Sequence, residues 1–136
     1  MPDFRDFLFF DLEYNPGSNA VREYGFAYQE QQVRAPASNT ILLEEAAGKA
    51  KFLVGHNVLR HDAPILRRYF NIDFPSIKAI DTLMLSSLMF PREPFHKLRK
   101  EYLNDENEPS NPLRDALLSK KLLEDCISKW ETFPWQ

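Results

Sequence analysis

The stretch Phe7-Leu8-Phe9-Phe10-Asp11-Leu12-Glu13 decides the expected fold, because a run of large apolar side chains leads directly into two carboxylates. A short run this rich in aromatic residues is typical of a central β-strand that is covered on both faces. Residues two apart on a strand project from the same face. We therefore expect Asp11 and Glu13 to direct both carboxylates into one space at the end of this strand.

The segments around this strand alternate between strand and helix patterns. Turn-forming residues at 15–19 and the loose alternation after them predict an antiparallel hairpin. Asn111-Pro112 is a favourable helix start, because Asn caps free amides and Pro suits the first helical position. The expected strands are 7–13, 21–28, 31–35, 51–54 and 77–81, and the expected helices are 40–50, 62–70, 82–89 and 111–130. This order predicts an α/β fold, with a mixed β-sheet flanked by helices.

Size and composition predict one domain over residues 1–136. The chain is 43% hydrophobic and 27% charged, with a net charge of -3, which excludes a disordered tail or a general polyanion-coating protein. The single cysteine, Cys126, lies in a leucine-rich helical pattern that indicates a small buried residue and fits a reducing, cytoplasmic setting. The sequence has neither a signal-peptide pattern nor an apolar run of about 20 residues, so we expect no membrane partner.

The paired carboxylates suggest a metal site. Like charges that are held together repel each other unless a divalent cation neutralises them, and hard oxygen ligands suit Mg²⁺ or Mn²⁺. The alternative is that one of Asp11 and Glu13 caps a turn before Asn15 and the other is solvated, since a short Asp-x-Glu pattern is a weak signal.

Two further aspartates stand in matching contexts. Asp62 follows a strand and Gly55-His56-Asn57 and opens a helix, which would place it at a sheet edge where ligands often bind. Asp115 lies one turn into the last helix among leucines, and a carboxylate on such an apolar face needs a partner or a metal. The alternative for Asp115 is a solvated position beside Arg114. Four carboxylates that hold two cations are an arrangement that hydrolyses phosphodiesters.

The order and spacing of these segments resemble the motifs of the DEDD (DnaQ-like) 3′→5′ exonucleases, which share the ribonuclease H-like fold. The matching segments are Phe9-Phe10-Asp11-Leu12-Glu13 with Tyr24-Gly25-Phe26, Val54-Gly55-His56-Asn57 with Asp62, Ile80-Asp81-Thr82-Leu83, and Asn111-Pro112-Leu113-Arg114-Asp115-Ala116. The resemblance runs over nearly the whole chain. It implies that two Mg²⁺ or Mn²⁺ ions are bound by the catalytic carboxylates Asp11, Glu13, Asp62 and Asp115.

A narrower resemblance concerns the exonuclease modules that precede RecQ-like helicase domains in bacteria. It is carried by Asp81-Thr82-Leu83-Met84-Leu85-Ser86, Phe90-Pro91 and Pro94-Phe95-His96-Lys97-Leu98. This similarity implies a helicase-associated role in DNA repair or recombination, and it suggests that the chain is the N-terminal piece of a larger helicase.

The chain departs from the family pattern at two places. Asp62 comes five residues after Asn57, whereas four is usual, and His61 holds the usual place. We favour Asp62 as the ligand, because His61 would select softer ions. Family members also carry a general base, either a His five residues or a Tyr four residues before the last aspartate, where this chain has Ser110 and Asn111.

His96 is the candidate general base, because an unperturbed imidazole pKa of about 6.5 suits proton transfer near neutral pH. It lies far from Asp115 in the sequence, so the 104–110 segment would have to fold it back over the metals. The alternative is that His96 packs against apolar neighbours or contacts a phosphate. His56 and His61 are expected to be structural, and the alternative is a His/His/Asp zinc site with Cys126.

Basic residues near the motifs are candidate nucleic-acid contacts. The candidates are Arg60, Lys97, Arg99 and Lys100, which would hold phosphates; the alternative is a solvated charged surface. A site that grips one phosphate with two metals needs an unpaired end, so the expected substrate is a single-stranded 3′ end. DNA is favoured over RNA, although only contact with the 2′-OH would distinguish the two.

These inferences predict a two-metal 3′→5′ exonuclease that releases nucleoside 5′-monophosphates. The rival hypothesis is a nucleic-acid-binding accessory domain of a helicase that has lost efficient proton transfer, which the absence of a His or Tyr before Asp115 favours. A third alternative is a structural docking domain whose acidic residues are incidental.

Overall fold

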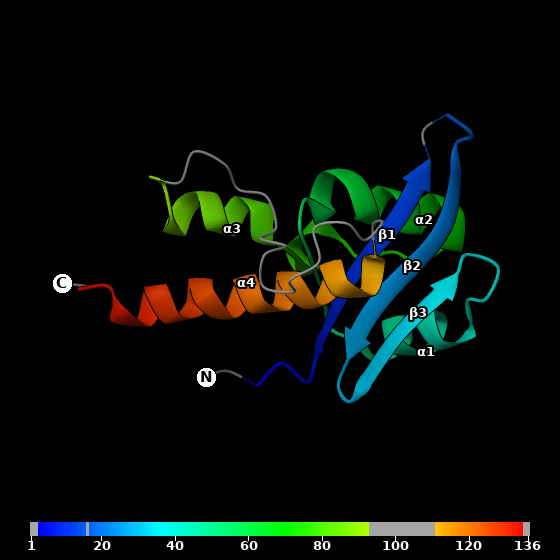
Figure 1. Cartoon of the computed structure of the whole chain (residues 1–136). Coiled ribbons are helices and arrows are strands. Elements are labelled where there is room, and N and C mark those ends of the chain that lie inside the picture. Colours follow the sequence, from blue (N-terminus) through cyan, green and yellow to red (C-terminus); the bar gives the residue numbers. More distant parts are fainter. Residues whose placement is uncertain (1–2, 16, 93–110, 135–136) are drawn as a thin grey trace.

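The apolar strand at the start of the chain lies at the centre of the fold. The computed structural model describes residues 3–15, 17–92 and 111–134, and Figure 1 shows these as one sheet with helices on both faces. The five-stranded sheet has the order β3-β2-β1-β4-β5. The strands are β1 (Phe7–Asn15), β2 (Ala20–Tyr28), β3 (Gln31–Pro36), β4 (Phe52–Gly55) and β5 (Ala79–Asp81). The expected α/β class and mixed sheet are confirmed, since β1-β2 and β2-β3 pair antiparallel and β1-β4 and β4-β5 pair parallel.

Alternation along β1 separates two cores. Leu8, Phe10 and Leu12 are buried in one cluster with side chains of two helices that Figure 1 shows behind the sheet. Phe9 is buried on the opposite face, against Ala116 of the last helix. The helical elements are α1 (Ile41–Lys49), the π-helical turn η1 (Val58–Asp62), α2 (Ala63–Phe70), the 3-10 turn η2 (Ser76–Lys78), α3 (Thr82–Met89) and α4 (Pro112–Thr132). Within the described ranges, no helix combines the length and apolar character needed to cross a bilayer.

The structure corrects three predicted boundaries. The helix expected over 62–70 begins at Ala63, because η1 precedes it and Asp62 ends that π-helical turn. The strand expected over 77–81 is shortened to Ala79–Asp81, since Ser76–Lys78 forms a 3-10 turn after Pro75. The strand expected over 51–54 runs from Phe52 to Gly55, and a Cβ at Gly55 would lie 2.8 Å from the carbonyl oxygen of Phe10.

Gly25 on β2 lets the first turn of α4 lie directly on the sheet. A Cβ at this position would lie 2.1 Å from the backbone nitrogen of Leu113, so no other residue fits without moving the helix. Asn111 caps the same turn, because its side-chain oxygen accepts hydrogen bonds from the amides of Leu113 and Arg114. Gly25 is the register partner of Asp11, so this contact brings the start of α4 to the middle of the central strand, which continues to Asn15 and not only to Glu13 as expected.

Candidate metal centre

Three carboxylates meet where β1 passes under the first turn of α4. Asp11 and Glu13 come from β1 and Asp115 from α4, and each offers an oxygen that lies within 4.8 Å of the other two. The strand geometry expected for Asp11 and Glu13 is therefore present. Asp115 is buried rather than solvated, and it faces the strand. Among the described residues, the group with metal-binding spacing contains only carboxylates, and neither histidine nor Cys126 belongs to it.

Asp62 approaches the same centre from the end of η1. It is only 1% exposed, and one of its carboxylate oxygens, Oδ2, has no hydrogen-bond partner among the described residues. The other oxygen, Oδ1, contacts Nδ1 of His61. Asp62 is not within the 4.8 Å group, but its negative charge acts on Asp11 more strongly than that of Asp115 or Glu13. A buried oxygen without a partner is costly, and a cation is one group that can satisfy it.

The electrostatics of the cluster disfavour the ionised forms of its buried carboxyl groups. Burial, followed by the charges of Asp62, Asp115 and Glu13, raises the pKa of Asp11 from 3.8 to about 9. Burial also raises the pKa of Asp62 to about 6, although the hydrogen bond from His61 opposes that shift. Both shifts have the causes expected when carboxylates are crowded away from water. A bound divalent cation would reverse them by stabilising the ionised forms.

Asp81 positions the segment that carries Asp62, a role that the sequence analysis missed. The side chain is buried, and Oδ1 accepts hydrogen bonds from the amides of Asn57 at 2.9 Å and Leu83 at 3.0 Å. Its Oδ2 accepts from the amide of Leu59 at 3.2 Å. One carboxylate therefore caps α3 and anchors the start of η1. An aspartate directly before a helical pattern was a visible capping signal, but its distant partners were not.

The histidines divide between the two sides of the site. His56 is structural as expected, because its Nδ1 lies 3.0 Å from Oγ1 of Thr82. His61 lies at the rim, with a side chain that is 43% exposed and an edge contact to the ring of Tyr14. The hydrogen bond with Asp62 raises the pKa of His61. His61 is thus a described imidazole beside the carboxylates, and its contact with Asp62 is compatible with the structural role expected for it.

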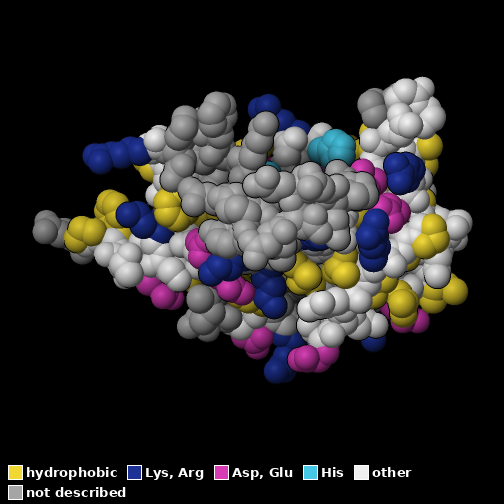
Figure 2. All heavy atoms as spheres, viewed as in Figure 1, with side chains coloured by type: hydrophobic (Ala, Val, Ile, Leu, Met, Phe, Trp, Pro, Cys, Tyr) yellow, Lys and Arg dark blue, Asp and Glu magenta, His cyan; other side chains and the backbone are white. Residues whose placement is uncertain are grey.

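The remaining predicted site residues are the five candidates for proton transfer and phosphate binding. Arg60 is exposed on η1. The candidate base and three candidate phosphate contacts lie outside the described residues: His96, Lys97, Arg99 and Lys100. Figure 2 shows Lys and Arg side chains close to Asp and Glu side chains over the β2 part of the sheet, so both signs of charge lie on this face.

Comparison with known proteins adds no family to this description. No protein-family model matches the chain, and no curated protein has significant sequence similarity to it. The case for a function therefore depends on the fold, on the geometry of the carboxylates and on the motifs.

Proposed function

We propose that this chain is a metal-dependent 3′→5′ exonuclease of the DEDD type, with a ribonuclease H-like fold, acting on single-stranded nucleic acid and preferably on DNA. The observation that carries the proposal is the meeting of Asp11, Glu13 and Asp115 within 4.8 Å, together with the buried Oδ2 of Asp62, which has no hydrogen-bond partner in the described part of the chain. A mixed sheet of order β3-β2-β1-β4-β5, with the first acidic motif on its central strand, supports it.

In this proposal, Asp11, Glu13, Asp62 and Asp115 hold two Mg²⁺ or Mn²⁺ ions. Such ions, when bound, lower the pKa of the attacking water and stabilise charge on the leaving 3′ oxygen. The chain contributes rigid placement: β1 and α4 fix three of the ligands, and Asp81 fixes the turn that carries Asp62. Burial of Asp62 excludes bulk water from one side of the centre.

Proton transfer from the attacking water needs a base, and the described residues offer one imidazole at the rim. His61 lies beside Asp62 and is partly exposed, so it can reach a water at the mouth of the site. His96 stays the candidate from the sequence. The rate of His61→Gln, compared with that of His96→Gln, separates the two.

A second candidate function is a nucleic-acid-binding accessory domain of a helicase with weak catalysis. The observation that favours it is the role of Asn111, which stands where related enzymes carry a catalytic Tyr. Here its side-chain oxygen caps α4 through Leu113 and Arg114 and is committed to holding the helix. In either function, the link to a helicase and to DNA repair or recombination is part of the proposal.

The test uses 3′-labelled and 5′-labelled single strands of DNA and RNA with Mg²⁺, with Mn²⁺ and with EDTA. We expect shortening from the 3′ end that stops in EDTA and in Asp11→Asn. The matched control is Asp73→Asn, which removes an exposed carboxylate outside the cluster. Tight binding without cleavage in either metal would instead establish the accessory domain.

A further inference from the structure

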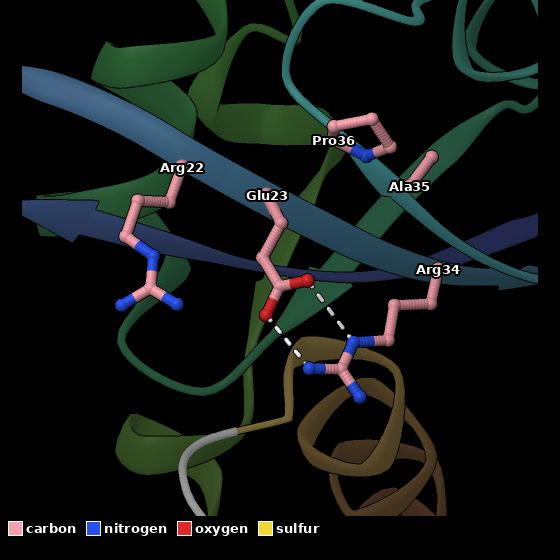
Figure 3. A pocket seen from close by; sticks show the side chains of 5 residues that line it. All are labelled: Arg22, Glu23, Arg34, Ala35 and Pro36. Carbon is pink, nitrogen blue, oxygen red and sulfur yellow. Dashed lines mark hydrogen bonds and ion pairs between the residues drawn. The ribbon is translucent and has the colours of Figure 1, made fainter.

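A second charged site, here called the arginine pocket, lies on the β2-β3 ribbon next to the acidic cluster. It has a volume of about 390 Å³ and is lined by Arg22, Glu23, Arg34, Ala35 and Pro36. Figure 3 shows the side chains of Arg22, Glu23 and Arg34 extending to the same side of the ribbon, toward the start of α4. None of these residues belongs to the carboxylate group described above.

The pocket contains an arginine that is held in a fixed orientation. Both carboxylate oxygens of Glu23 accept hydrogen bonds from Arg34, from Nη2 at 2.9 Å and from Nε at 3.0 Å. This hydrogen bonding lowers the pKa of Glu23, so the pair stays ionised at neutral pH. A guanidinium that is already oriented loses less conformational freedom when it binds an anion.

Arg22 reaches the pocket because of an irregularity in the sheet. Glu13 pairs with Glu23 and Tyr14 pairs with Val21, so Arg22 is an extra residue in β2. A β-bulge of this kind changes the direction of a side chain, and it brings two successive residues, Arg22 and Glu23, to one side of the strand. Among the described residues, Arg22 hydrogen-bonds through its backbone carbonyl, to the amide of Ala37, and its side chain lies in the pocket wall. The lining of the pocket therefore carries two guanidinium groups and one carboxylate.

The strand register connects the pocket to the metal centre. Glu23, in the wall of the pocket, is the direct partner of Glu13, so the two sites lie on neighbouring strands, whose backbones are about 4.8 Å apart in a β-sheet. Arg34 is paired with Gly25, which in turn is paired with Asp11. Directly paired residues lie on the same face of a sheet, so the arginines and the acidic cluster open on one surface.

We infer that the arginine pocket binds a backbone phosphodiester of the strand being degraded, on the 5′ side of the scissile bond. Guanidinium groups bind phosphate oxygens through paired hydrogen bonds, and such contacts fix the register of a strand without selecting bases. The inference rests on the proposed function for the nature of the strand. It assigns Arg22 and Arg34 a positioning role and adds no chemical step.

The test compares Arg22→Gln with Arg22→Lys and with Lys49→Gln. The side chain of Arg22 is exposed, and the backbone hydrogen bond from Ala37 to its carbonyl is kept in both variants. Lys49 is an exposed cation on α1, on the other face of the sheet. Binding of a fluorescent ten-nucleotide DNA strand is measured by anisotropy in EDTA over a range of salt concentrations. We expect Arg22→Gln to weaken binding about five- to tenfold and to reduce the slope of log K against log salt by about 0.7, the value for one lost phosphate contact on a single strand. Arg22→Lys should keep most of the affinity for the DNA strand. Lys49→Gln should have the affinity and the salt slope of the wild type.

A second measurement separates this inference from the proposed function. The p-nitrophenyl ester of thymidine 5′-monophosphate contains a scissile phosphate but no neighbouring phosphodiester. We expect Arg22→Gln to hydrolyse this ester at the wild-type rate, while its KM for the DNA strand rises. Unchanged DNA binding and salt slope in Arg22→Gln, or an equal loss on both substrates, would overturn the inference. If neither the wild type nor any variant cleaves either substrate, but Arg22→Gln still binds DNA more weakly and with a smaller salt slope, the arginine pocket is a phosphate-binding site and the exonuclease proposal is wrong.

Discussion

Replacing Asp11 by Asn should make the metal-free protein more stable at neutral pH, although it removes a central carboxylate of the site. In the folded protein, burial and the three neighbouring carboxylates hold the pKa of Asp11 at about 9, against an ordinary value of 3.8. A raised pKa means that folding favours the protonated form. The contribution of this group to stability is therefore complete below about pH 4 and is lost as the pH rises toward 9.

The size of the effect follows from this pKa difference. Between about pH 4 and pH 7, Asp11 is ionised in the unfolded chain but protonated in the folded one. Over these roughly three pH units the free energy of unfolding falls by about 1.4 kcal/mol per unit, or about 4 kcal/mol at most. Asp11 is only partly buried by its exposed area, so solvent screening reduces the figure, and we expect a gain of about 2 kcal/mol for Asp11→Asn. For a chain of this length that is a rise in Tm of roughly 6 °C.

The assay is thermal and urea unfolding in EDTA, at several pH values between 4 and 8.5, for the wild type, Asp11→Asn and the control Asp73→Asn. The advantage of Asp11→Asn should be largest at the alkaline end and vanish near pH 4. Addition of Mn²⁺ should then raise the Tm of the wild type and of the control but not that of Asp11→Asn, because only ligands that bind the folded state stabilise it. The order of the variants should therefore reverse with metal.

Two results would refute this reasoning. If Asp11→Asn is less stable than the wild type in EDTA at pH 7, or if the difference does not change with pH, charge repulsion at Asp11 is not what the structure indicates. If Mn²⁺ stabilises all three proteins equally, the ion binds elsewhere. Either outcome would remove the main support for the metal centre.

Two further predictions concern the residues that position the ligands. Gly25→Ala should destabilise the protein by about 3 kcal/mol in urea unfolding, because its Cβ meets the backbone of Leu113, and it should abolish stabilisation by Mn²⁺. The control Gly48→Ala, where a Cβ meets nothing within 4 Å, should stabilise α1 by about 1 kcal/mol; equal effects at the two glycines would contradict the close approach. Asp81→Ala should cost about 3 kcal/mol, since three amides lose their acceptor, and it should weaken Mn²⁺ binding measured by calorimetry. Full Mn²⁺ affinity in a folded Asp81→Ala protein would show that this residue does not position Asp62.

The sequence was sufficient for features that depend on local periodicity. The period of two on β1 predicted that Asp11 and Glu13 share a face, and they do. Asn111-Pro112 predicted the start of α4, and the cap is formed as expected. Both features depend on residues a few positions apart, for which spacing alone determines geometry.

Features that depend on distant partners could not be predicted in this way. The Asp81 side chain holds the amides of Asn57 and Leu59, which belong to another part of the chain. Asp62 ends a π-helical turn, and nothing in the spacing of apolar residues distinguishes such a turn from an ordinary helix start. The bulge at Arg22 appears only when β1 and β2 are paired, so the arginine pocket has no signature in the sequence.

The close contact between the first turn of α4 and Gly25 also affects the order in which the parts of the chain can fold together. Asp11 belongs to β1 and Asp115 to α4, so the acidic cluster cannot exist until the chain has been synthesised as far as α4 and this helix has docked. A nascent or partly folded chain would hold two carboxylates on a strand but would lack the third. Metal uptake should therefore coincide with the final long-range step of folding, and a bound ion would report that this step is complete.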